Sequence, residues 1–363
     1  MTSLLMTADT VGGVWTYALE LAEALAPLGV RVPLATMGPP LSAGQRAAVE
    51  ASAVAAVHEG DFALEWTADP WDDVDRAGRW LLDLEDRLRP DVVHLNGYAH
   101  GALAWRAPTV VVAHSCVLSW WDAVQGEPAP AEWDQYRRRV TEGLRAAGVV
   151  VAPTAALLAE LSRWYGLDGG QVIANGRRSD RAGPVAAKED LILGGGRLWD
   201  EAKNLALLNR VAPRLRWPVA IAGDPRHPVT DETAAAPGGS RLLGRLEPPE
   251  MAGWLLRASI FVLPARYEPF GLGPLEAALA GCALVLGDIP SLREVWETAA
   301  LYVGPDDDAG LVQALNGLIS DAPARAELAG KAWRRALELS PDRMAAAYHR
   351  VYTSVTATHG VSA

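Results

Sequence analysis

The sequence predicts an α/β protein with two doubly wound parallel-sheet domains, and three observations support this prediction. At 363 residues the chain exceeds one ordinary domain, and half of its residues are hydrophobic, which is enough for two separate cores. Short apolar runs alternate with segments of helical periodicity, and this alternation starts again at about residue 190. Most of the runs are continuously apolar, as parallel strands covered on both faces require.

The first half contains five expected strands. The apolar run 3–6 leads into a turn with Gly12 and Gly13, and a helical pattern then continues to Pro27. The other expected strands of this half are residues 30–38, 91–97, 109–115 and 148–154. Helical patterns at 77–90 and 133–148 lie between them.

The second half repeats the alternation. Its expected strands are residues 190–197, 217–224, 240–245, 259–264 and 282–288, with helical patterns at 204–215 and 248–258. Residues 171–190 read as the linker. We therefore expect an N-terminal domain at 1–172, a C-terminal domain at 173–341, and a last helix at 342–363 that packs back on the first domain.

Charge and composition exclude several classes of protein. The net charge of -11 argues against nucleic acid as a partner and against a basic membrane-docking patch. No apolar stretch approaches the roughly 20 residues of a transmembrane segment, and the first residues lack the pattern of a signal peptide, so we expect a cytoplasmic protein. Cys116 and Cys282 are too few for a disulfide framework or a metal cage.

Residues 265–288 carry the most informative motif. Glu268 and Glu276 are separated by two prolines and two glycines, namely Pro269, Gly271, Gly273 and Pro274. This places Glu268 in a loop and Glu276 in the first turn of a helix that begins near Pro274. A loop of this kind exposes backbone N–H groups beside a helix N-terminus, which suits a phosphate, while a carboxylate at its rim suits sugar hydroxyls.

A second group of candidate residues lies at 193–205. Arg197 at a strand end and Lys203 at a helix start could embrace a diphosphate, and the alternative is a solvated, charged helix start. Gly12 and Gly13 would permit close approach of the backbone to a ligand. A complete G-x-G-x-x-G fingerprint is missing at both glycine turns, which argues against a nicotinamide cofactor.

The segment EPFGLGPLE and its surroundings at 259–285 resemble the family 4 retaining glycosyltransferases. The resemblance implies the GT-B fold, in which two Rossmann-like domains face a central cleft. It also implies a hexosyl-type, retaining glycosyltransferase that moves a sugar from a nucleoside-diphosphate sugar, with UDP slightly preferred, to a hydroxyl acceptor such as a soluble glycan or small molecule. Base selectivity would come from backbone groups around residues 243–246.

The same resemblance implies roles for individual residues. Glu268 would contact the donor sugar hydroxyls, and Glu276 would hydrogen-bond the ribose. Arg197 and Lys203 would neutralise the leaving diphosphate in place of a metal, so no metal is expected and activity should survive EDTA. Backbone groups at the two glycine turns would hold sugar and phosphate; they belong to Gly12, Gly13, Phe270, Gly271, Leu272 and Gly273.

His114 follows an expected strand, where a catalytic loop should emerge. In the family a histidine here lies beside the donor sugar; the alternative is a histidine bonded to backbone. Ser115 and Cys116 lack a third group that would orient a base, which argues against a nucleophile. His94 and His100 lack a third metal ligand at a recognisable spacing and are interpreted as structural or cleft-lining.

Four residues are candidates for the acceptor side. Trp120 and Trp121 could form a wall on which a sugar stacks, although core packing explains most tryptophans. Asn96 replaces a histidine common in the family. Arg177 replaces an apolar residue and could hold an anionic substrate or be solvated.

Two other functions remain open. A disaccharide phosphorylase of the same fold would bind inorganic phosphate where the donor diphosphate sits. A non-catalytic sugar-nucleotide-binding protein would keep the pocket without turnover, and the presence of Glu268, Glu276, Arg197 and Lys203 counts against it.

Overall fold

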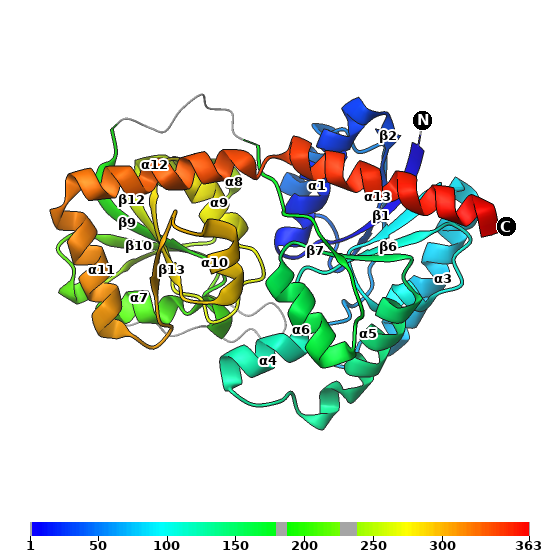
Figure 1. Cartoon of the computed structure of the whole chain (residues 1–363), viewed down its shortest axis with the longest axis horizontal. Coiled ribbons are helices and arrows are strands. Elements are labelled where there is room, and N and C mark those ends of the chain that lie inside the picture. The colour runs from blue at the N-terminus through cyan, green and yellow to red at the C-terminus, as the bar shows by residue number, and fades with distance from the viewer. Residues whose placement is uncertain (1, 179–186, 226–237, 363) are drawn as a thin grey trace. The chain divides into compact units, whose positions relative to one another are not determined.

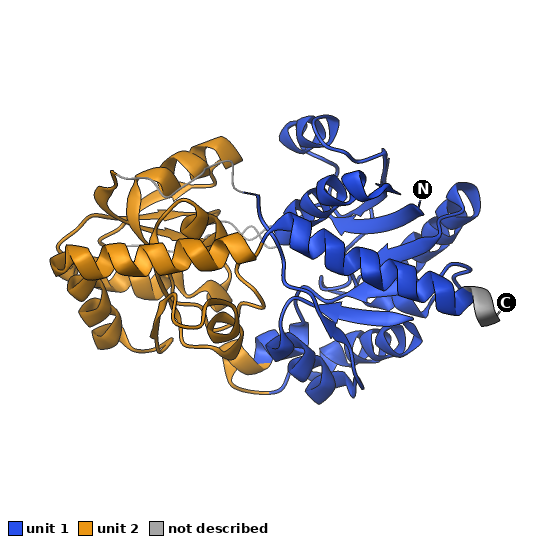
Figure 2. Ribbon diagram, turned by 45° about the horizontal axis from the view of Figure 1, so that its top comes forward, with its two compact units in different colours: residues 1–121, 128–178, 340–363 blue, residues 122–127, 179–339 orange. Residues whose placement is uncertain are grey.

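A computed structural model describes residues 2–178, 187–225 and 238–362. The chain divides into two compact units (Figure 2). Unit 1 comprises Met1–Trp121, Pro128–Arg178 and Ser340–Ala363, and unit 2 comprises Asp122–Glu127 and Ser179–Leu339. Part of the expected linker, residues 179–186, lies outside the described residues.

Unit 1 contains a parallel sheet with the order β4-β3-β1-β5-β6-β7-β8, and β2 pairs with β1. Figure 1 labels β1, β2, β6 and β7 of this unit. Its strands are β1 (Thr2–Asp9), β2 (Val30–Arg31), β3 (Pro33–Met37), β4 (Ala56–Glu59), β5 (Val92–Leu95), β6 (Thr109–Val112), β7 (Val149–Ala152) and β8 (Gln171–Val172). In the register of the central strands, Met6 pairs with Leu34 on one side and with His94 on the other. The five expected strands are present.

The helices described with unit 1 cover both faces of this sheet. They are α1 (Gly13–Leu25), α2 (Ala43–Glu50), α3 (Trp71–Leu88), α4 (Val117–Gln125), α5 (Asp134–Ala146), α6 (Ala155–Tyr165) and α13 (Pro341–Ser362), with short 3-10 turns at Ala26–Leu28, Ala99–Ala102 and Ala131–Trp133. Successive residues of β1 point to opposite faces: Leu4 and Met6 join the cluster beneath α1 and α13, whereas Leu5 packs towards α3. This alternation explains why the middle of the strand, Leu4–Met6, is continuously apolar.

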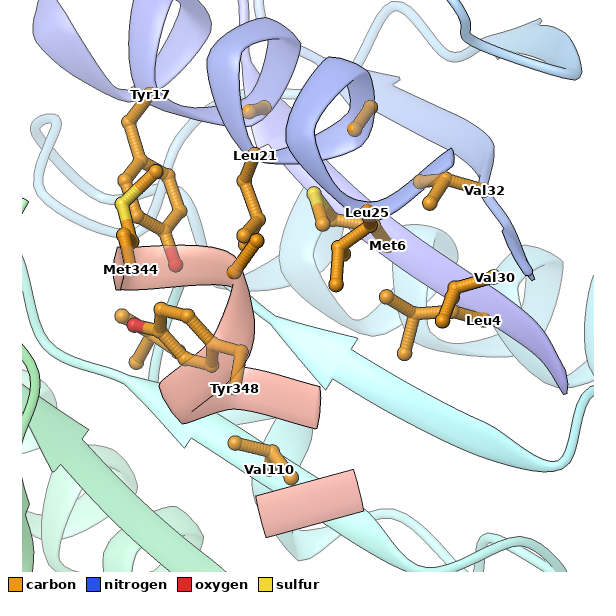
Figure 3. Packing of buried hydrophobic residues seen from close by; sticks show 14 of the residues in the cluster. Leu4, Met6, Tyr17, Leu21, Leu25, Val30, Val32, Val110, Met344 and Tyr348 are labelled. Carbon is orange, nitrogen blue, oxygen red and sulfur yellow. The ribbon is translucent and has the colours of Figure 1, made fainter. Parts of the chain in front are cut away.

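The last helix, α13, packs on unit 1. Tyr348 lies beside Tyr17 of α1, with ring centroids 6.2 Å apart, and both side chains are buried (Figure 3). Met344 occupies the same cluster. The apolar stripe of the helix is therefore buried against α1 and the sheet.

Unit 2 contains a second parallel sheet with the order β11-β10-β9-β12-β13-β14. Its strands are β9 (Glu189–Gly195), β10 (Val219–Ala222), β11 (Arg241–Gly244), β12 (Ala258–Leu263), β13 (Ala283–Gly287) and β14 (Leu301–Val303). The helices are α7 (Leu205–Val211), α8 (Pro248–Arg257), α9 (Leu272–Leu279), α10 (Pro290–Trp296), α11 (Asp308–Ser320) and α12 (Ala322–Glu338), with 3-10 turns at Glu201–Lys203 and Ala212–Arg214. All five expected strands of this half are present.

Three strands, namely β4, β8 and β14, are present in addition to those expected from the sequence. They have two to four residues each and lie at sheet edges. Their residues are mostly half-buried or exposed, so the continuous apolar signal of a central strand is missing. None of the helices in the described parts of the chain is long and apolar enough to cross a membrane.

Candidate active site

The strand order of unit 2 locates the place where a ligand would bind. β9 and β12 are neighbours at the centre of the sheet, and the chain leaves β9 towards β10 on one side and reaches β13 from β12 on the other. In open parallel sheets, the carboxyl ends of the two strands at such a switch point flank the binding crevice. The segments that emerge here are residues 196–204 and 264–271, which carry the two groups of candidate residues.

Lys203 and Glu268 meet at this point. The ammonium nitrogen of Lys203 lies 2.9 Å from Oε2 of Glu268, and the two side chains are 14% and 16% exposed. A charged pair so far removed from water is costly to form unless the geometry is good. The structure therefore brings together a cation and a carboxylate that the sequence assigned to one pocket, and both remain partly accessible.

Backbone contacts fix the two segments against each other. The backbone N–H of Arg266 donates to the carbonyl of Ala202 at 2.8 Å. Asn204 adopts a left-handed conformation, with a φ of 52°, and its amide donates to the carbonyls of Pro264 at 3.0 Å and Pro305 at 2.6 Å. Asparagine tolerates this conformation better than most residues, and its amide satisfies carbonyls that the loops leave open.

Arg197 is held within its own loop. Its guanidinium donates to Oδ2 of Asp200 at 2.6 Å and lies over the Trp199 ring, 5.0 Å from the centroid. Asp200 is buried and also accepts from the backbone N–H of Ala202 at 3.1 Å. The Arg197 side chain is 42% exposed, so it can contact an anion at the mouth of the loop. The sequence analysis did not identify Asp200 or Asn204, although an aspartate before a short helical turn is a common capping signal.

The glycine turn before α9 exposes backbone donors, but the helix differs from the expected one. α9 begins at Leu272, two positions before Pro274, because proline is tolerated in a first turn, where its missing N–H is not needed. Glu276 is therefore the fifth residue of the helix and not, as expected, part of its first turn. Gly271 precedes the helix with a φ of 95°, which favours glycine strongly.

The loop residues around Glu268 are positioned by their neighbours. Ser291 donates its hydroxyl hydrogen to the Glu268 carbonyl at 2.5 Å, and the Phe270 N–H lies 3.5 Å from Glu268 Oε1. The Phe270 side chain is buried, so only its backbone is offered to a ligand. The backbone N–H groups of the first turn of α9 have no partner within the helix, which makes this end of α9 a place for an anion.

In unit 1, the glycine turn after β1 also has the expected form. Gly12 has a φ of 80° and caps α1 without a side-chain hydrogen bond, and Gly13 starts the helix. Both glycines are exposed. The turn thus presents bare backbone at the carboxyl end of β1, as close approach of a ligand requires.

His114 belongs to a buried polar network at the carboxyl ends of β5 and β6. Its Nε2 lies 2.8 Å from Oδ1 of Asn96, and the same oxygen lies 3.1 Å from Nε2 of His94. His94 Nδ1 lies 2.7 Å from the Tyr352 hydroxyl on α13. Burial lowers the pKa of His114 to about 3 and that of His94 to about 4, and each ring is therefore neutral at neutral pH.

A carboxylate that the sequence analysis missed lies at the end of β1. Asp9 accepts a hydrogen bond from the Trp66 indole at 3.3 Å, and burial, together with the nearby charge of Glu65, raises the Asp9 pKa to about 7. Glu65 accepts from the backbone N–H groups of Tyr98 and Ala99 at 2.9 and 2.8 Å. The position of Asp9, at the last residue of a central strand, is the signal that could have identified it.

The remaining acceptor-side candidates make local contacts in unit 1. The rings of Trp120 and Trp121 meet edge to face with centroids 5.8 Å apart, and Trp121 packs against the hydrophobic core. Arg177 donates to Glu20 of α1 at 2.6 Å, so it is paired and not simply solvated. Core packing thus accounts for part of the tryptophan pair.

The described parts of the chain provide neither a metal-binding cluster nor an activated nucleophile. No three His, Cys, Asp or Glu side chains gather there closely enough to hold a metal ion. His100 Nε2 lies 2.9 Å from the Val74 carbonyl, in a structural role. Both cysteines are buried, and burial raises the pKa of the Cys116 thiol and raises that of Cys282 to about 11.

Solved structures with the same fold define the class of this protein. Sucrose-phosphate synthase from Thermosynechococcus elongatus is 18% identical, with a TM-score of 0.79 over 99% of this chain and 100% of that one. Anabaena Alr3699/HepE, solved with UDP-glucose, is 17% identical, with a TM-score of 0.75 over 98% of this chain and 100% of that one. The two parallel-sheet domains form the GT-B fold of glycosyltransferases.

Sequence comparison assigns the family. Glycosyltransferase Family 4 matches residues 11–181, and Glycosyl transferases group 1 matches residues 189–321. The Mycobacterium tuberculosis glycogen synthase is 29% identical over 77% of this chain and 72% of its own length. A D-inositol 3-phosphate glycosyltransferase of Thermobispora bispora is 26% identical over 94% of this chain and 90% of its own length. The chain belongs to the family 4 glycosyltransferases.

Proposed function

We propose that this glycosyltransferase moves a hexosyl group from a nucleoside-diphosphate sugar to a hydroxyl acceptor with retention of configuration. The observation that supports the proposal best is the pairing of Lys203 with Glu268 at the switch point of unit 2, beside the N-terminus of α9. A cation, backbone donors and a carboxylate are the groups that a diphosphate joined to a sugar requires.

In the proposed reaction, the bond between the anomeric carbon and the diphosphate oxygen breaks while the acceptor oxygen attacks from the same face. The acceptor proton passes to the leaving diphosphate, so no further acid or base is needed. Negative charge grows on the diphosphate as the bond breaks. Lys203, Arg197 and the N-terminal end of α9 would stabilise that charge in the transition state.

We propose roles for the other groups of the site on the same basis. Glu268 would accept hydrogen bonds from donor sugar hydroxyls, and Glu276 would accept from the ribose. Backbone groups at the end of β11, where the Gly244 carbonyl accepts from Gly223 at 2.9 Å, would contact the base. A uridine donor is preferred in the proposal, supported by the UDP-glucose in the similarly folded Anabaena protein.

We further propose that the transfer needs no metal ion, because Lys203 and Arg197 would supply the positive charge that a metal ion would otherwise bring to the diphosphate. Activity in excess EDTA equal to that in its absence would support this, and loss of activity that added Mg²⁺ restores would contradict it. A cytoplasmic location is also proposed, since Cys282 is a free thiol and a reducing compartment keeps it so.

The decisive experiment is a binding and turnover screen with UDP-, GDP-, ADP- and dTDP-sugars. Calorimetry would measure donor binding, and release of the nucleoside diphosphate would measure slow hydrolysis or transfer. We expect Lys203→Ala and Glu276→Ala to weaken binding of the preferred donor at least tenfold. Lys331→Ala is a matched control, because Lys331 forms an ion pair on the exposed face of α12.

Each other outcome identifies a different function. Binding of inorganic phosphate and release of a sugar phosphate, without binding of any nucleotide, would identify a phosphorylase. Tight nucleotide-sugar binding without hydrolysis or transfer would identify a sensor. If Lys203→Ala binds the donor as well as Lys331→Ala does, the donor site has been placed wrongly.

A further inference from the structure

Asn96 lies at the centre of the buried network in unit 1, and its amide has a single possible orientation. The amide nitrogen lies 2.6 Å from the backbone carbonyl of Thr7, and the amide oxygen faces the two histidines. A carbonyl can only accept hydrogen bonds, so the atom beside it must be the NH₂ group. The orientation of the amide therefore follows from the chemistry of its neighbours.

This orientation determines which nitrogen of each imidazole carries the proton. The Asn96 oxygen can only accept, and both Nε2 atoms lie within hydrogen-bonding distance of it, at 2.8 Å for His114 and 3.1 Å for His94. Each Nε2 must therefore carry a hydrogen; the Tyr17 hydroxyl, 3.4 Å from His94 Nε2, is then a second acceptor for that N–H and not a donor to it. In a neutral imidazole, Nδ1 is then bare and accepts.

The two bare Nδ1 atoms have different surroundings. His94 is completely buried, and its Nδ1 lies 2.7 Å from the Tyr352 hydroxyl, which donates to it. His114 is only partly buried, and no group in the described parts of the chain hydrogen-bonds to its Nδ1. His94 thus has a structural role, whereas His114 keeps an accessible hydrogen-bond acceptor, Nδ1, at the carboxyl end of β6.

We propose that Asn96 is a positioning residue that holds His114 as its Nε2–H tautomer, so that His114 Nδ1 accepts a hydrogen bond from a sugar hydroxyl of the substrate. This inference rests on the proposed glycosyl transfer, which supplies a sugar as the substrate. The inference specifies the direction of the hydrogen bond: the sugar hydroxyl donates and His114 Nδ1 accepts. A protonated imidazolium could not accept this hydrogen bond. The third residue of the arrangement is Thr7, whose carbonyl orients the amide.

The first test uses the free protein. Long-range ¹H–¹⁵N spectra of protein labelled in histidine would report each ring nitrogen, with the His114 signals assigned through His114→Gln. We expect a protonated Nε2 and a bare Nδ1 at neutral pH, and a change at Nδ1 when the sugar donor is added. A bare Nε2, a protonated ring or an Nδ1 unmoved by a bound donor would overturn the inference.

The second test changes Asn96. Asn96→Ser cannot bridge Thr7 and the two histidines, so His114 should exchange between tautomers, and kcat/KM for transfer should fall on the order of tenfold. Tyr352→Phe is the matched control: it removes the hydroxyl that lies 2.7 Å from His94 Nδ1 but keeps the Asn96 amide and its contact with the Thr7 carbonyl. It should keep the His114 tautomer and a kcat/KM within about twofold of the parent.

These measurements distinguish an error in the inference on Asn96 from an error in the proposed function. If Tyr352→Phe lowers kcat/KM as much as Asn96→Ser, general disturbance of the network explains the loss and the inference is wrong. If Asn96→Ser keeps both the tautomer and the rate, the inference is wrong as well. Absence of nucleotide-sugar binding by the parent protein would instead refute the proposed function, since the tautomer is measured without substrate.

Discussion

Lys203 Nζ lies 2.9 Å from Glu268 Oε2, although the two residues are 65 positions apart in the sequence. They come from the loops after β9 and β12, which are adjacent strands of one sheet. The pair thus forms only when unit 2 is folded, and in the proposed reaction it must open to let the diphosphate contact Lys203. The same contact stabilises the two loops before a donor binds and holds both groups in position for the donor.

Breaking this pair should destabilise unit 2 as well as weaken donor binding. Lys203→Met leaves a partly buried carboxylate without its cation, which should cost about 2 kcal/mol in the free energy of unfolding. The double variant Lys203→Met with Glu268→Gln should recover most of that loss, because no unpaired charge remains. Urea unfolding measures the stability, and calorimetry with the preferred nucleotide sugar should show weak donor binding in both variants.

An exposed ion pair of the same unit provides the control. Arg210 and Asp308 pair at 2.7 Å with side chains 57% and 35% exposed, so Arg210→Met should cost less than about 1 kcal/mol and leave donor binding unchanged. Equal losses of stability in Lys203→Met and Arg210→Met would show that the Lys203 pair is an ordinary surface contact.

Asn204 connects three loops of the candidate site. Substitution of Asn204 should therefore weaken donor binding only by shifting these loops. Asn204→Ala removes two hydrogen bonds and places at a φ of 52° a residue that tolerates this conformation less well than asparagine, so we expect a cost of about 2–4 kcal/mol. Asn204→Gly removes the bonds but accepts the backbone angle, and should be destabilised by about 1 kcal/mol less.

Donor affinity should fall by a similar factor in the two Asn204 variants, since both lose the bonds to the carbonyls of Pro264 and Pro305 that align the loops. Chemical denaturation and calorimetry on the same samples would check both quantities. Full donor affinity in Asn204→Gly would show that the hydrogen bonds do not position the site.

The sequence predicted much of unit 2 and of its site, because the evidence there is local. Continuous apolar runs identify the central strands, and the rule that carboxyl ends of neighbouring strands meet places Lys203 near Glu268. The contacts that hold the site are not local: Asn204 reaches Pro305, 101 positions away. A pattern along one chain segment carries no information on such a partner.

The network in unit 1 was less predictable for the same reason. His94 contacts Tyr352 across 258 positions, through a helix whose packing site depends on the finished fold. The sequence identified His114 and Asn96 as separate candidates, but not that one amide joins them. Asp9 ends a central strand, which marks it as a candidate, but its raised pKa depends on Trp66 and on burial, and neither can be read from the residues next to it in the sequence.

Gly271 should be intolerant of a side chain. Its φ of 95° is strained for alanine, and a Cβ would lie 3.2 Å from Pro274 Cγ and 3.3 Å from Leu292 Cδ2. We expect Gly271→Ala to cost about 2–3 kcal/mol in stability and to weaken donor binding, because the first turn of α9 must shift. Thermal unfolding and calorimetry would measure the two effects.

A glycine within a helix of the same unit is the matched control for Gly271. Gly253 lies in α8 and has open space where a Cβ would point, so Gly253→Ala should stabilise the protein by about 0.5–1 kcal/mol and leave donor binding unchanged. If both alanine variants changed stability in the same direction, the backbone conformation assigned to Gly271 would be wrong.

Titration of Asp9 should make the stability of unit 1 depend on pH, and Asp9→Asn should remove this dependence. Its pKa rises from 3.8 to about 7 on folding, mainly through burial, so between about pH 4 and pH 7 the folded state binds more protons than the unfolded state. Stability from this group therefore falls as pH rises through that window, by at most about 1.4 kcal/mol per pH unit, and levels off above it.

Asp9→Asn cannot ionise, and its amide oxygen can still accept from the Trp66 indole. The advantage of Asp9→Asn over the parent should thus be larger at pH 8 than at pH 5 in urea unfolding, whereas Asp83→Asn, on the exposed face of α3, should change little at either pH. An equal difference at both pH values would mean that Asp9 titrates like an exposed carboxylate and that the carboxyl end of β1 is open to water.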